Sequence, residues 1–470
     1  MIKKLLLLSL IASQLMISCS SDNSDEVIPE VKPDPKPEVE LTIEEQIAAL
    51  LKQPYSNLTP AQQKTKFEAE ANEMLVQLDK SKTSGAIEAI KNLGRLFSLK
   101  HIDLFDGKSQ NGVEEVLNIS GVYGTYTWDD AKKTWTKTAS TTELKFVFPA
   151  KEGQTTNNAV LTSKSTSSSI KFSNVDTYAD WGYNSETQQY GPITPSVQDW
   201  FYLPSTVEAL LTINGAQAAT FTSNAKYSSQ NKSPEDYSYK LALNDGYTWE
   251  MSGKKGTETT SKALFTYNGK SLINFNVTSS ADIDKLIENV ELSQYKGKAN
   301  TLFSIMDNFI VIGNTDLAAD AADKEALYKN NTRPASPDGE NPKSDYKAYY
   351  TALNAYEKKI SEGKAASFNK NTKLSLVSKK DGTKIADIVL RSEKVGDDYL
   401  VSLPVWNAQG KYWTWSPNGE LFAQPYLDEV VYLKFNDTTE AAMDVYFSEI
   451  FNSLHTKFTD FTSAFQTKSK

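Results

Sequence analysis

The sequence YSYKLALNDGYTWEMSGKKGTETTSKALFTYNGKSLINFNV, residues 237–277, decides the fold class. Apolar residues alternate with polar ones along it, which is the period of a strand with one buried face. Asp245-Gly246 and Asn268-Gly269 interrupt the alternation, as Asn214-Gly215 does upstream. These dipeptides favour two-residue hairpin turns, in which both turn positions need a positive φ. The stretch therefore predicts an antiparallel meander whose apolar face another part of the chain must cover.

Helical periodicity comes before, between and after the strands. Helices are expected at about 43–52, 59–80, 85–99, 282–291, 316–329, 344–362 and 439–466. The order of the patterns divides the expected globular body, residues 41–470, into helices at 41–100, a sheet at about 113–280, a helical insert at about 281–364, strands at about 368–436 and a C-terminal helix at about 439–466.

These patterns predict an α+β fold built on a large, curved antiparallel sheet, and an open half-barrel is one form that such a sheet can take. The first two helices start with capping boxes, Thr42 with Glu45 and Thr59 with Gln62. The last helix carries a broad aromatic-rich stripe. We therefore expect the N-terminal and C-terminal helices to pack against the apolar face of the sheet.

Residues 1–18 have the three parts of an export signal. Two lysines are followed by an apolar run, Leu5 to Ile17, which is shorter than the roughly 20 residues that span a bilayer. The run ends in Leu15-Met16-Ile17-Ser18-Cys19, which resembles a bacterial lipobox. In lipobox proteins the signal is removed before the cysteine, which then carries lipid chains. An ordinary secretory signal is the alternative, but Cys19 is the only cysteine and lies where a lipobox requires it.

Residues 19–40 are acidic and rich in proline, which predicts a disordered tether. Within it, Ser20 to Glu26 resembles the surface-export signal of Bacteroidota lipoproteins. This resemblance implies a lipid-anchored outer-membrane protein, with the cell surface favoured over the periplasmic face. The body resembles uncharacterised Bacteroidota lipoproteins in Gly121–Lys137, Phe146–Pro149 and Leu203–Ser205, and this second resemblance implies no activity.

The charge balance disfavours nucleic acid as a partner. The net charge is −9, and it becomes −11 when the signal and its two lysines are removed. Phosphate backbones are bound by clustered positive charge, which this acidic chain lacks. We therefore expect no nucleic-acid partner, and the oligomeric state is left open by the sequence.

The sequence also lacks the residues of the common catalytic and metal sites. Its two histidines, His101 and His455, are expected at a helix end and at the edge of a core rather than in a triad. Zinc sites need more histidine and cysteine than the chain has. Asp316, Asp320 and Asp323 share one helical face, which is more typical of a solvated face than of a calcium site. No cofactor and no metal are expected.

Exposed aromatic residues are the remaining candidates for a site. Six of them lie in polar, turn-rich segments: Trp181, Tyr183, Trp200, Tyr412, Trp413 and Trp415. Such rings can form platforms for sugars, because a ring face attracts the C–H groups of a pyranose. The alternative is that they fill the rim of a large sheet. Trp128 and Trp135 more plainly flank a hairpin.

Two classes of function are compatible with these observations. The first is non-enzymatic binding of a glycan or of an apolar small molecule. The second is a hydrolase acting on glycans, which requires two carboxylates roughly 5–10 Å apart in a cleft. A purely structural role in the envelope would show neither feature. Binding is the favoured hypothesis, because nothing in the sequence singles out a carboxylate pair.

Overall fold

The computed structural model describes most of the chain from residue 41 onward. The described residues are 41–100, 116–117, 119–177, 180–185, 187–193, 197–228, 234–280, 297–415, 419–447, 453, 456 and 459. Cys19, the tether, His101, His455 and the helix expected at 282–291 lie outside them, as does most of the helix expected at 439–466.

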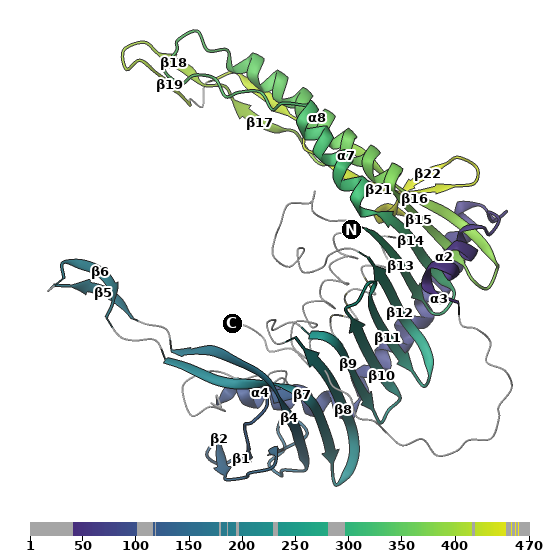
Figure 1. The fold of residues 1–470 in the computed structure, drawn as a ribbon, viewed down its shortest axis with the longest axis vertical. Helices are drawn as coiled ribbons and strands as arrows, with labels where there is room; N and C mark the ends of the chain where they lie inside the picture. The colour runs from purple at the N-terminus through teal and green to yellow at the C-terminus, as the bar shows by residue number, and fades with distance from the viewer. Residues whose placement is uncertain are drawn as a thin grey trace.

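A single open sheet of 16 strands forms the body (Figure 1). Its strands, in spatial order, are β2 (Thr134–Thr138), β1 (Gly124–Asp129), β3 (Leu144–Phe148), β4 (Ala159–Thr177), β7 (Val197–Ile213), β8 (Ala216–Tyr227), β9 (Pro234–Leu243), β10 (Tyr247–Lys254), β11 (Thr259–Tyr267), β12 (Lys270–Ser279), β13 (Lys298–Ile305), β14 (Phe309–Asp316), β15 (Thr372–Ser378), β16 (Thr383–Lys394), β21 (Leu427–Phe435) and β22 (Glu440–Ala442). Neighbouring strands pair antiparallel except β1 and β3, which pair parallel. The α+β class and the large, mostly antiparallel sheet are therefore confirmed.

The hairpin turns follow the predicted dipeptides, with one difference. Asn214-Gly215 and Asn268-Gly269 have positive φ at both positions, 52° and 79° in the first and 48° and 75° in the second. At Asp245-Gly246 only the glycine has a positive φ, 102°. Its N–H donates to the Leu243 carbonyl, so this turn has three residues and only one left-handed position.

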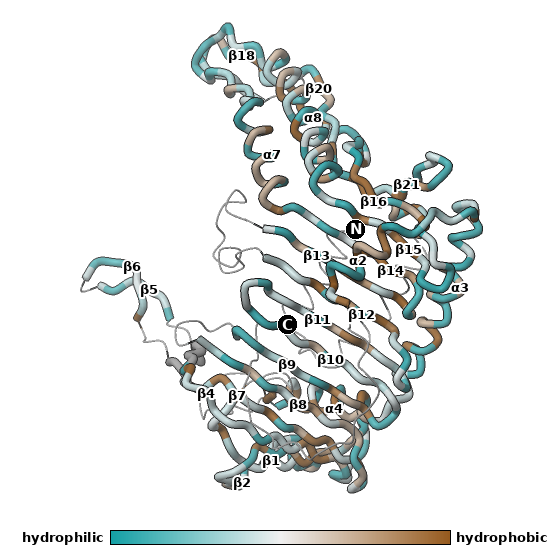
Figure 2. The backbone as a smooth tube through the Cα atoms, turned by 45° about the vertical axis from the view of Figure 1, so that its right-hand side comes forward, coloured by the Kyte–Doolittle hydropathy of each residue, from teal (hydrophilic) through white to brown (hydrophobic). Residues whose placement is uncertain are grey.

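Helices α3 (Pro60–Asp79) and α4 (Gly85–Leu99) contribute to the main hydrophobic core, together with alternate residues of the sheet. A short 3-10 helix, Lys80–Thr83, links them. The ring of Phe67 on α3 lies 4.9 Å from that of Phe309 on β14 and 4.5 Å from that of Phe447, measured between centroids. Figure 2 shows hydrophobic residues interleaved with hydrophilic ones along the strands.

Helix α2 (Ile43–Leu51) contacts the opposite face of the sheet. Ile47 packs in a second cluster with Ile310 and Ile312, whereas Phe309 and Val311 of the same strand belong to the main core. Successive side chains of a strand point to opposite faces. Strand β14 is therefore covered on both of its faces.

A polar cluster fastens the segment after α2 to β16. Tyr55 donates its hydroxyl hydrogen to Asp387, which also accepts a hydrogen bond of 2.7 Å from Ser375. The Lys384 ammonium lies 3.3 Å from the same carboxylate and 3.9 Å from the centre of the Tyr55 ring. Burial opposes the ionisation of Asp387, but the hydrogen bonds and Lys384 outweigh it, so the pKa of Asp387 is lowered.

Acidification is expected to weaken this cluster. A carboxyl whose pKa is lower in the folded chain adds stability above its unfolded pKa and loses it as the pH falls through the folded pKa. We expect Asp387→Asn to unfold more easily than the wild type at pH 7, by about 1 kcal/mol, with the difference shrinking below about pH 4. Urea unfolding at pH 7 and pH 3 measures this. Asp397→Asn, at an exposed position, is the control, and an equal pH dependence in both variants would contradict the expectation.

The expected helical insert at 281–364 requires correction. Helices α7 (Leu317–Asn330) and α8 (Tyr346–Asn371) lie where helices are expected, but β13 and β14 precede them in the same region. The apolar run Phe309–Ile312 does not alternate, because both faces of β14 are buried, and the period of two is therefore missing there.

Two smaller differences concern the ends of the strand regions. Val116 and Leu117, inside the stretch expected as sheet, are helical. Near the C-terminus, Glu440–Ala442 forms β22 by pairing with β21, so the helix begins at Met443 (α9, Met443–Tyr446) rather than near 439. No helix in the described ranges is both long and apolar enough to cross a bilayer.

Two arms project from opposite ends of the sheet (Figure 1). The first begins where β4 and β7 extend past their other neighbours, and it carries the small hairpin of β5 (Trp181–Asn184) and β6 (Gln189–Pro192). The second, which we call the helical arm, contains α7, α8 and the continuation of the β16–β21 hairpin. Its outer strands are β17 (Tyr399–Ser402), β18 (Val405–Asn407), β19 (Tyr412–Thr414) and β20 (Leu421–Gln424).

Candidate binding site

The strands of the helical arm form three successive antiparallel pairs along one long hairpin. β16 pairs with β21, β17 with β20 and β18 with β19, so the chain runs out to the tip through β16, β17 and β18 and returns through β19, β20 and β21. Helix α8 is fastened along this hairpin. The Asn369 side chain exchanges two hydrogen bonds of 2.8 Å with the Leu390 backbone, and Asn354 donates to the Ala423 carbonyl at 3.0 Å.

The loop between α7 and α8 meets the hairpin at the tip. The indole N–H of Trp413 donates to the Asn341 carbonyl at 2.9 Å. Asp345 caps α8 by accepting a hydrogen bond of 2.8 Å from the Ala348 N–H. These bonds hold the start of α8 beside β18 and β19.

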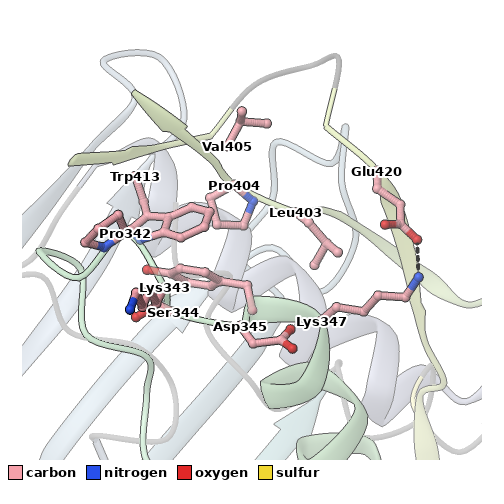
Figure 3. Close-up of a pocket in the computed structure, with 11 residues that line it drawn as sticks. Pro342, Lys343, Ser344, Asp345, Lys347, Leu403, Pro404, Val405, Trp413 and Glu420 are labelled. Carbon is pink, nitrogen blue, oxygen red and sulfur yellow. Dashed lines mark hydrogen bonds and ion pairs between the residues drawn. The ribbon is translucent and has the colours of Figure 1, made fainter. Parts of the chain in front are cut away.

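An open pocket of about 400 Å³ lies at this junction. Its volume is within the range of small-ligand sites. Its lining comes from the start of α8 and from both halves of the hairpin: Pro342, Lys343, Ser344, Asp345, Tyr346, Lys347, Leu403, Pro404, Val405, Trp413 and Glu420. Figure 3 shows the ring of Trp413 on one side of the pocket and the Lys347–Glu420 ion pair on the other.

Aromatic rings gather around the pocket. The Trp413 ring lies 4.9 Å from that of Tyr346 and 5.7 Å from that of Trp406, measured between centroids. The Trp415 ring lies 6.2 Å from that of Tyr346 and is 60% exposed. Because the indole N–H of Trp413 is already bonded to Asn341, this ring offers a ligand its face rather than its donor.

Three charged side chains of the pocket, those of Lys347, Glu420 and Asp345, are engaged with protein partners. Lys347 lies 2.5 Å from Glu420, and this hydrogen bond raises the pKa of Lys347. The carboxylate of Asp345 caps its own helix. The pocket can therefore bind through ring faces and polar groups, and its two carboxylates, Asp345 and Glu420, are hydrogen-bonded within the protein.

The six predicted aromatic residues are divided among separate places. Trp413 lines the pocket, and Trp415 lies beside it, with its ring against that of the lining residue Tyr346. Tyr412 is exposed on β19, where its hydroxyl lies 3.4 Å from the Asn407 amide. Trp181 and Tyr183 lie on β5, at the other end of the sheet.

Trp200 is exposed on β7, at the base of the arm that carries β5 and β6. The Lys171 ammonium lies 5.0 Å from the centre of its ring. Trp128 and Trp135 face each other across the β1–β2 hairpin, as predicted, with their rings 5.2 Å apart.

Tyr346, Pro342 and Lys347 are pocket residues that the sequence analysis missed. Pro342 precedes α8, and Tyr346 and Lys347 are its first two residues. The sequence pattern there predicted a helix but no binding site. Their proximity to Trp413 depends on a contact across about 70 positions of the chain, and no local pattern announces such a contact.

The three aspartates considered for calcium have protein partners instead. Asp316 caps α7, Asp320 pairs with Lys324, and Asp323 pairs with Lys370 on α8. Across the described part of the chain, no group of three or more His, Cys, Asp or Glu side chains is placed to hold a metal ion.

Comparisons with known proteins do not assign this pocket. No protein-family model matches the chain, and no similar protein was found among curated proteins or solved structures. A proposal of function therefore depends on the pocket, the arms and the sequence itself.

Proposed function

We propose that this protein is a lipid-anchored envelope protein that binds glycan, without transforming it, at the tip of the helical arm. The gathering of Trp413, Tyr346 and Trp415 around an open pocket carries the proposal. Sugar rings combine C–H faces, which stack on aromatic faces, with hydroxyl groups that need polar partners. The pocket offers both kinds of contact.

An apolar small molecule is the less favoured ligand. Such ligands bind best in enclosed, mostly apolar cavities. This pocket is open and carries Lys343, Asp345, Lys347 and Glu420 on its lining. Burying an apolar molecule against these side chains would remove water from charged groups without replacing it.

The sheet would serve as the rigid support of the two arms. We propose that it is curved into an open half-barrel, with α3, α4 and the helix expected at 439–466 covering its apolar face. The contacts of Phe67 with Phe309 and Phe447 support this arrangement, because they join α3 to β14 and to the start of that last region.

The lipid anchor and the membrane location are also proposals. Cys19 would carry the lipid anchor, and residues 19–40 would act as a tether that lifts the body away from the membrane. The acidic stretch Ser20 to Glu26 favours the outer face of the outer membrane. A glycan-binding arm on the cell surface would meet polysaccharides from outside the cell.

Replacing Trp413 tests the binding proposal. We expect Trp413→Ala, made in the chain from Cys19 onward, to weaken binding of its best glycan about 10- to 100-fold, since removal of a central aromatic contact costs about 1.5–3 kcal/mol. The measurement is a screen of neutral and acidic glycans on an array, followed by titration calorimetry with the best one. Trp413→Phe should keep most of the affinity, because it keeps a ring face.

Tyr328→Ala is the matched control, because Tyr328 is an exposed aromatic residue of α7 that does not line the pocket. Equal affinity of Trp413→Ala and the wild type would sink the proposal for this pocket. Absence of binding to every glycan on the array would sink the glycan proposal as a whole.

A further inference from the structure

The β5–β6 hairpin, which we call the aromatic ribbon (residues 181–184 and 189–192), carries its aromatic side chains on one face. Trp181 pairs with Pro192 and Tyr183 with Tyr190. Residues directly opposite in an antiparallel pair share a face, as do alternate residues of one strand. The three rings therefore share one face, and they are 63%, 64% and 70% exposed in chain order.

The other face of the ribbon carries no aromatic ring: it has a glycine pair and a polar pair, Asn184 with Gln189. Gly182 pairs with Gly191, so neither residue of this pair contributes a side chain. A Cβ at Gly182 would lie only 3.0 Å from the Ile193 side chain, which occupies the space, and a Cβ at Gly191 would meet nothing within 4 Å. The ribbon is thus a short hairpin with its aromatic rings on one face.

The stability of the fold does not account for these rings. None of the three belongs to either hydrophobic cluster of the described residues. Paired glycines inside a hairpin weaken it, and exposed rings gain little from burial. A contiguous exposed apolar patch on a projecting element is typical of a binding surface.

The amino-acid composition around the ribbon indicates which class of ligand it favours. Residues 180–193 contain Asp180 and Glu186 but no lysine or arginine. Anionic lipid surfaces and phosphate groups attract basic segments, so they are poor partners for this one. Two strands of four residues also offer too little area for a stable protein interface, which buries about 1,200–2,000 Å² in total. Tyrosine and tryptophan faces without cations fit a neutral sugar chain.

We propose that the aromatic ribbon is a second glycan-stacking surface, and that it and the arm-tip pocket hold one long, neutral polysaccharide at two points. This inference rests on the proposed function of the pocket. The two arms project from opposite ends of the sheet and both extend to the left in Figure 1. Two linked sites give a large gain in affinity only for a ligand that reaches both.

The test compares a long and a short form of the same neutral glycan, namely the polysaccharide and its hexasaccharide. We expect the triple variant Trp181→Ala/Tyr183→Ala/Tyr190→Ala to bind the polysaccharide about tenfold or more weakly than the wild type, because avidity is lost. Its affinity for the hexasaccharide should be unchanged, as the pocket alone holds that ligand. The variant with phenylalanine at the three positions should keep polysaccharide binding, and the thermal midpoint should not move in either variant.

Equal polysaccharide binding by the triple alanine variant and the wild type would overturn the inference. The inference would also be overturned if the triple alanine variant lost binding to phosphatidylglycerol vesicles instead of binding to glycan. The ribbon would then be a membrane contact. Trp413→Ala separates the two proposals, because it should weaken the binding of both the polysaccharide and the hexasaccharide. If it weakens neither while the triple variant loses the polysaccharide, the pocket proposal fails and the ribbon remains as a glycan site.

Discussion

Phe67→Ala is expected to lower the free energy of unfolding by about 3–5 kcal/mol, the usual cost of removing a buried phenylalanine ring. The Phe67 side chain is 3% exposed and lies between the rings of Phe309 and Phe447. Its loss would leave a cavity where α3, β14 and the segment after α9 meet, and tightly packed surroundings relax only in part. Urea unfolding followed by tryptophan fluorescence measures the change.

Val76→Ala is the control for Phe67→Ala. Val76 lies on the same helix but is 57% exposed, so its replacement should change the free energy of unfolding by no more than about 0.5 kcal/mol. Similar midpoints for the two variants would mean that α3 is not held by this contact. The packing of the helix on the sheet would then need another explanation.

Cys19→Ala is expected to release the protein from the membrane fraction almost completely. The thiol of Cys19 is the attachment point of the proposed lipid, and each buried CH₂ of an acyl chain contributes about 0.8 kcal/mol to membrane binding. Two or three chains make attachment stable, and their loss leaves the short apolar run of the signal, Leu5 to Ile17. Fractionation after a high-salt wash, with incorporation of labelled palmitate, measures both effects.

Ser18→Ala is the matched control for this prediction. It keeps a small residue before Cys19, so the lipobox pattern is preserved and both lipid incorporation and membrane attachment should persist. A Cys19→Ala protein that stays membrane-bound after the wash would refute the lipoprotein assignment. The glycan proposals would be unaffected by that outcome, because they depend on the body alone.

The candidate site could be predicted only in part. Trp413 and Trp415 stand out in the sequence as aromatic residues in a polar, turn-rich segment, but so does Trp200, which the structure places on β7. The partner ring of Tyr346 gives no such signal, because Tyr346 is the first residue of helix α8 and the sequence there indicates only a helix. A pocket arises where such segments meet, and their meeting depends on the whole path of the chain.

The same distinction applies to the helices. The capping boxes at Thr42 and Thr59 predicted the starts of α2 and α3, and both are present. Nothing in either helix told which face of the sheet it would cover, and the two contact opposite faces of β14. That double coverage also concealed β14 in the sequence, since a strand buried on both faces has no alternation.

By itself, the sequence determined the period-two strands, the hairpin turns and the helix caps of this protein. Each of these depends on backbone conformation and hydrogen bonds within a few residues, as the positive φ values at Asn268 and Gly269 illustrate. Only the tertiary structure decided the order of 16 strands, the faces covered by α2 and α3, and the pocket beside Trp413. These features follow from contacts between distant segments, whose energy depends on how much surface the whole fold buries rather than on any local pattern.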